Sequence, residues 1–94
     1  MENRTLIIDG ASVGGMEQLH GRFYAAFDFP DCYGENLDAL HDCLTDIGNY
    51  NAVIRITNDS ALEQSLGEKT AAALRRVLRD CATENPHITV EFTD

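Results

Sequence analysis

Three short runs of branched and aromatic residues, 5–9, 52–57 and 88–92, stand far apart in this 94-residue chain, and segments with helical spacing separate them. The first run, Thr5–Asp9, is almost continuously apolar, which is typical of a strand covered on both faces. Parallel neighbouring strands need such long helical connections. The order β-α-α-β-α-β therefore predicts an α/β fold, with a three-stranded parallel β-sheet packed with α-helices. Residues 1–94 should form one domain, and the pattern leaves the strand order open.

The spacing of apolar residues predicts main helices over residues 16–29, 37–47 and 68–84, and a short helical turn near 61–65. Pro30 should stop the first helix, because the residue before a proline is pushed out of the helical region. Asn36 is a favourable N-cap for the second helix, and Gly48 should close it in the left-handed conformation. Asn85-Pro86 should break the third helix.

Net charge is the most informative part of the composition. Seven Lys and Arg residues against sixteen Asp and Glu residues give −9, and the stretch from Phe23 to Ile54 holds six acids and no base. Nucleic acids are bound through Lys and Arg, which replace condensed counterions, so a nucleic-acid partner is not expected. An acidic surface of this kind attracts a basic protein or a cation.

The cysteines and the N-terminal residues indicate the cellular compartment in which we expect the protein. Three cysteines cannot all pair within one chain, and no CxxC or zinc-type spacing is present, so neither a disulfide framework nor a metal or cofactor is expected. Residues 1–4 do not open a signal peptide, and no apolar run is long enough to cross a membrane. We therefore expect a cytoplasmic protein with reduced thiols and no membrane partner.

The second helix carries the acids at a regular spacing. Asp38, Asp42 and Asp46 follow each other at four-residue intervals, with Thr45 on the same ridge. Like charges at this spacing destabilise a helix by a few tenths of a kcal/mol per pair. A helix selected only for stability would carry a Lys or Arg in at least one of these positions. We interpret the ridge as a surface kept acidic for a partner.

Two other interpretations of the same residues are weaker. Asp38, His41 and Asp42 could offer ligands to a cation, but the calcium-loop pattern is absent. Catalysis would need a nucleophile, a base and an orienting group in a pocket, and no motif of that kind is present. His20 and His87 stand isolated in the sequence. We therefore expect no catalytic residues and no enzyme.

Residues 33–45 read Tyr-Gly-Glu-Asn-Leu-Asp-Ala-Leu-His-Asp-Cys-Leu-Thr. This stretch resembles the signature of the barstar family of intracellular ribonuclease inhibitors at every position except His41, where the family has tryptophan. A weaker likeness runs along the chain, at Leu19-His20, Pro30, Arg79-Asp80 and Ile88-Thr89. An uninterrupted match over a dozen residues of mixed type is a specific signal.

The resemblance implies an inhibitor that blocks the basic active site of a ribonuclease, in a 1:1 complex, by inserting the acidic helix and loop Tyr33–Ile47. Asp42 matches the carboxylate that enters the phosphate site, and Asp38 matches a second charged contact. Asp80 replaces a glutamate that reaches the enzyme from the third helix. The predicted partner-binding residues are Tyr33, Gly34, Asn36, Asp38, His41, Asp42, Thr45, Asp46 and Asp80.

Four positions in this region depart from the family pattern. Cys32 stands in place of an aromatic residue, His41 and Ile47 in place of tryptophans, and Asp46 in place of glycine. Aromatic residues often dominate interface energy, so we expect a reshaped contact. The alternative is a barstar-like immunity or regulatory module that binds a different basic protein or toxin, or a weak cation-binding protein.

Overall fold

The computed structural model describes all 94 residues. The elements are β1 (Asn3–Asp9), α1 (Met16–Phe27), α2 (Leu37–Thr45), β2 (Asn51–Thr57), the 3-10 turn η1 (Asp59–Ala61), α3 (Leu62–Leu66), α4 (Glu68–Glu84) and β3 (Ile88–Phe92). The three strands are parallel, in the order β1-β2-β3. The predicted α/β fold with a three-stranded parallel sheet is confirmed, and the strand order, which the sequence left open, follows the chain.

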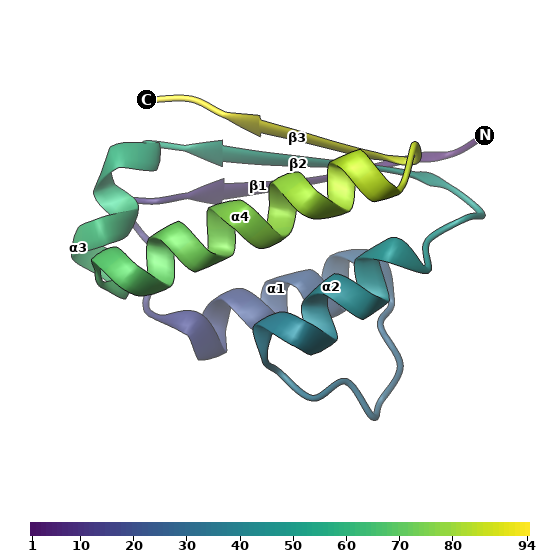
Figure 1. The fold of residues 1–94 in the computed structure, drawn as a ribbon, viewed down its shortest axis with the longest axis horizontal. Helices are drawn as coiled ribbons and strands as arrows, with labels where there is room; N and C mark the ends of the chain where they lie inside the picture. Colours follow the sequence, from purple (N-terminus) through teal and green to yellow (C-terminus); the bar gives the residue numbers. More distant parts are fainter.

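The helices cover one face of the sheet, which gives a two-layer structure (Figure 1). The expectation that β1 is covered on both faces is wrong, because Leu6 and Ile8 are buried while Ile7 between them is 50% exposed. On the open face Ile7 lies in register with Arg55, and Arg55 with Glu91. Arg55 Nε lies 3.0 Å from Glu91 Oε2. This face of the sheet is therefore exposed to solvent and carries the Arg55–Glu91 ion pair.

A single cluster of 20 buried apolar residues fills the space between sheet and helices. Helix α2 contributes Leu40 and Leu44, and α4 contributes Leu74 and Leu78, all without exposed surface. These residues fix which side of α2 faces inwards. None of the helices combines the length and apolar character needed to span a bilayer.

Two predicted helix ends differ from the structure. Helix α1 ends at Phe27, two residues earlier than expected, because Asp28 adopts the left-handed conformation with φ 51°. The amide of Phe29 then donates to the Tyr24 carbonyl (3.3 Å), a typical closure of a helix end. Helix α2 ends at Thr45 and is followed by Asp46 in the right-handed region. The predicted left-handed closure at Gly48 is wrong, since its φ is not positive.

Candidate protein-binding face

The N-terminus of α2 is capped as predicted. The Asn36 side chain accepts a hydrogen bond from the amide of Ala39 (2.8 Å), while its own backbone is extended. The cap satisfies one of the free amides of the first turn. Since Leu40 and Leu44 point into the core, the side of α2 that carries Asp38 and Asp42 is left exposed.

The C-terminus of α2 is capped from a distant part of the chain. Asn85, at the end of α4, is buried, and its Nδ2 donates to the carbonyls of Leu44 (3.1 Å), Thr45 (3.3 Å) and Ile47 (2.8 Å). The last carbonyls of a helix lack their usual intrahelical partners, although the Leu44 carbonyl also accepts from the Ile47 amide (3.2 Å). The sequence pattern marked Asn85 only as a helix breaker. No local sequence signal could reveal that Asn85 also caps α2, because its hydrogen-bond partners lie 38 to 41 residues away.

Helix α4 also holds the middle of α2. The Cys81 thiol donates to the His41 carbonyl (3.8 Å), and His41 Nε2 donates to Glu84 Oε2 (2.5 Å). The bond to Glu84 raises the pKa of His41 above its ordinary value, and the nearby Asp42 carboxylate adds to this effect. His41 therefore joins α2 to α4.

The acids of α2 are exposed and largely without partners. The Asp42 side chain is 82% exposed, and its ion pair is with the neighbouring His41 (3.5 Å). Asp38 and Asp46 are exposed and form no ion pair with any Lys, Arg or His. The predicted acidic ridge is thus a row of carboxylates that face solvent on a fixed helix.

Asp80 adds a carboxylate from α4. It is exposed, and it belongs to the surroundings of the buried Cys81 thiol. Burial raises the pKa of Cys81 to about 12, and the charges of Glu84, Asp80 and Asp42 act in the same direction.

The loop before α2 is anchored through Tyr33. Its ring packs edge-on against Phe29, with the ring centroids 4.9 Å apart. Its hydroxyl shares a hydrogen bond with Nδ1 of the buried His20. Burial raises the pKa of Tyr33 well above its ordinary value and lowers that of His20. Although His20 stands isolated in the sequence, it ties this loop to α1.

Gly34 and Thr45, which are also predicted to bind the partner, lie close to other parts of α2 and its cap. A Cβ at Gly34 would stand 3.2 Å from Asn36 Nδ2, the side chain that caps α2. The Thr45 hydroxyl donates back to the His41 carbonyl (2.9 Å) within its own helix. Asp38, His41, Asp42 and Thr45 lie on α2, with Tyr33, Gly34 and Asn36 before it, Asp46 after it and Asp80 on α4. The Tyr33 hydroxyl is bonded to the buried His20, and the Thr45 hydroxyl is bonded within its own helix.

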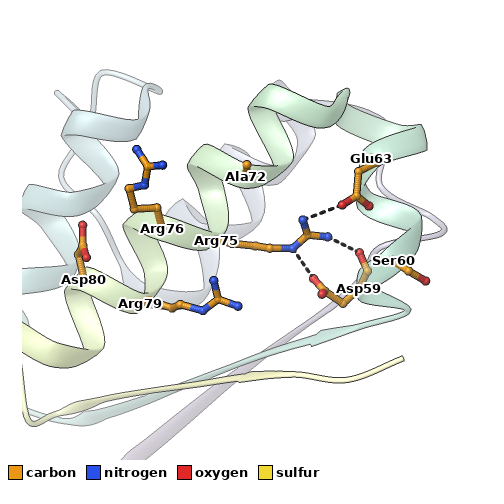
Figure 2. A pocket seen from close by; sticks show the side chains of 8 residues that line it. All are labelled: Asp59, Ser60, Glu63, Ala72, Arg75, Arg76, Arg79 and Asp80. Carbon is orange, nitrogen blue, oxygen red and sulfur yellow. Dashed lines mark hydrogen bonds and ion pairs between the residues drawn. The ribbon is translucent and has the colours of Figure 1, made fainter.

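The arginines of α4 lie in a separate hollow between η1, α3 and α4. Figure 2 shows Arg75 reaching Asp59 and Glu63, with Nε 2.9 Å from Asp59 Oδ1 and Nη1 2.8 Å from Glu63 Oε1. Asp80 stands at the end of this hollow away from the Arg75 cluster (Figure 2). Arg75 therefore neutralises carboxylates of its own hollow and none on α2. No group of three or more His, Cys, Asp or Glu side chains converges as a metal site would require.

A family model described as "Barstar (barnase inhibitor)" matches residues 3–93. The chain belongs to the barstar family. The predicted resemblance is therefore confirmed. The barstar family comprises inhibitors rather than enzymes.

A relative in Bacillus subtilis (strain 168), named "Putative ribonuclease inhibitor YrdF", is 55% identical over 42 residues. The match covers 45% of this chain and 46% of that protein, so it spans a little less than half of each. The name of this relative agrees with the barstar assignment.

Proposed function

We propose that this protein inhibits a basic ribonuclease in a 1:1 complex, with α2 and the loop before it seated in the active site of the enzyme. The observation that carries the proposal is the row of exposed carboxylates at Asp38, Asp42 and Asp46, which have no Lys or Arg partner within the chain. Its membership of the barstar family supports the same role.

The chemistry of the enzyme accounts for this arrangement. A ribonuclease must hold the phosphates of RNA with Lys, Arg and His side chains, and carboxylates spaced along a helix can occupy those phosphate positions. Asp42 would enter the phosphate site, and Asp38 and Asp80 would contact neighbouring cations. Charge complementarity of this kind speeds association and selects the partner.

Rigidity of α2 contributes to affinity in this proposal. Binding orders side chains and loops, and a surface that is already fixed loses less entropy. Helix α2 is held at its N-terminus by Asn36, at its C-terminus by Asn85 and in its middle by the His41–Glu84 bond. In this scheme Tyr33 and Thr45 position the loop and the ridge more than they contact the enzyme.

The proposal is tested by titrating the purified protein against a panel of basic microbial ribonucleases, with RNA cleavage followed at low and at physiological salt. We expect stoichiometric inhibition of at least one enzyme. Asp42→Ala should weaken the complex by about 2–5 kcal/mol, as truncation of a buried, paired charge does. The dominance of one such carboxylate is already described for the barnase–barstar complex and is not a new prediction.

Glu91→Ala serves as the matched control, because it removes the same charge on the open face of the sheet. It should leave inhibition unchanged. A loss below roughly 0.5 kcal/mol for Asp42→Ala, the size of an exposed pair, would contradict the site. Absence of inhibition across the panel would contradict a ribonuclease target and favour a different basic protein or toxin.

A further inference from the structure

A row of charged residues along α4 lies beside the acidic ridge of α2. Arg76, Asp80 and Glu84 follow each other at four-residue intervals, which makes them neighbours on one side of the helix. Glu84 binds His41 in the middle of α2, and Asn85 caps the end of α2, so the two helices run side by side in the same direction (Figure 1). Arg76 therefore lies towards the beginning of α2.

Arg76 is the arginine of α4 that has no partner within the chain. Arg75 pairs with two carboxylates, and the Arg79 guanidinium lies over the Phe92 ring, 4.8 Å from its centroid. Arg76 is exposed and takes part in no ion pair and no ring contact. Asp80 stands one turn further along, at a spacing that allows an ion pair, yet the two do not pair. Figure 2 shows both side chains leaving α4 on the same side.

We propose that Arg76 is a specificity-determining contact of the inhibitor and pairs with a carboxylate of the ribonuclease beside its active site. Arg76 lies about 6 Å along the helix axis from Asp80, which is one of the proposed contacts. A stable interface covers about 800 Å² on each partner, so an enzyme that meets Asp38 and Asp80 extends over Arg76 as well. The inference rests on the proposed function and adds a cation to an otherwise acidic face.

The charge of Arg76 determines what the enzyme must present to it. A Lys or Arg of the enzyme at this place would put like charges together, and like charges across an interface suppress binding. A carboxylate suits the planar fork of an arginine, which can pair with both oxygens. The acidic ridge alone would accept any enzyme with phosphate-binding cations. Arg76 would then select, by repulsion as well as attraction, the enzymes that carry an acid next to those cations.

The test repeats the inhibition titration with Arg76→Ala against the enzyme that the native protein inhibits. Arg55→Ala is the matched control, because it removes the same charge from the open face of the sheet. Both variants gain the same net negative charge, so any general change in attraction to a basic enzyme is common to them. We expect the complex of Arg76→Ala to be about tenfold weaker than that of Arg55→Ala, as loss of a charge-assisted hydrogen bond implies. Equal or tighter binding by Arg76→Ala would overturn the proposal.

A charge reversal identifies the carboxylate. Arg76→Glu should weaken the complex further, and an enzyme with the opposing Asp or Glu changed to Lys should bind Arg76→Glu more tightly than the native inhibitor. Tighter binding of Arg76→Glu to the unchanged enzyme would show that a cation faces this position and would contradict the proposal. Urea unfolding should be almost unchanged in both Arg76 variants, because the side chain is exposed and without contacts.

The two proposals fail in different ways. Inhibition that Asp42→Ala removes and Arg76→Ala leaves unchanged would contradict the Arg76 contact alone. Absence of inhibition across the panel of ribonucleases would contradict the proposed function, and the Arg76 contact with it.

Discussion

Asp42 and His41 are neighbours in the sequence but have different parts in the candidate face. The Asp42 side chain is 82% exposed and turned to solvent, whereas His41 is bound to Glu84 of α4. The family pattern has tryptophan at His41, so a residue class that often anchors interfaces is replaced here by an internal link. The reshaped contact that the sequence suggests stays a prediction, and the bond between His41 and Glu84 offers a physical reason for it.

The His41–Glu84 bond should make stability depend on pH. The folded-state pKa of His41 is raised above 6.5, mainly by Glu84. A raised pKa means that the stabilisation is fully present below about pH 6.5 and is lost as the pH rises through the folded-state value. Urea unfolding should therefore show a larger stability difference between the native protein and His41→Asn at pH 6 than at pH 8.

Two features keep this comparison specific. Burial lowers the pKa of His20, which has the opposite effect on stability, but His20 is present in both proteins and its contribution cancels. Glu84→Gln removes the acceptor and should remove most of the pH-dependent difference. A difference that stays constant between pH 6 and pH 8 would show that the bond to Glu84 does not stabilise the fold.

At the scale of elements, α2 depends on α4 for its C-terminal end. Asn85→Ala would remove the side-chain donor to the carbonyls of residues 44, 45 and 47, at a cost of about 1–3 kcal/mol in the free energy of unfolding. Chemical denaturation measures this loss. Asn49→Ala, which replaces an exposed asparagine in the adjoining loop, should change stability by less than about 0.5 kcal/mol.

The orientation of α2 depends on its apolar stripe. Leu40 is completely buried, so Leu40→Ala should cost about 2–5 kcal/mol through lost burial and the cavity that remains. The measurement is again the free energy of unfolding. An unchanged value would mean that this side of α2 does not face the core.

Much of α2 could be predicted from local sequence, and the reasons are visible in individual residues. Asn36 caps within three residues, and the apolar stripe follows helical spacing, so both signals are local. Gly48 was a misleading signal, because Asn85 supplies the C-terminal cap instead. Periodicity also failed for β1, where a continuous apolar run conceals an exposed Ile7. The candidate site was found from charge spacing, but its supports from α1 and α4 come from long-range contacts.

At the scale of the whole molecule, residues 23–54, which include α2 and its loop, hold six acids and no Lys or Arg and so carry most of the net charge of −9. Such an asymmetric charge should steer a basic partner towards the candidate face. The association rate with an inhibited ribonuclease should fall about tenfold or more between low salt and ~0.5 M salt, because screening shortens the reach of the field. Stopped-flow fluorescence measures this rate, and a rate independent of salt would contradict steering.

The hydrogen bonds that Glu84 and Asn85 make to α2 and its C-terminal end also have a consequence for the order of folding. The bonds that hold α2 come from Glu84 and Asn85, which follow their partners by 38 to 43 residues, and β1 pairs with β2 across 48 residues. Contacts of such long range form late, because a long loop must close first. We expect the amides of residues 44–47 to gain hydrogen-exchange protection during refolding no earlier than those of α4. The candidate face would then reach its final spacing only in the last stage of folding, and partly folded chains would carry its charges without its shape.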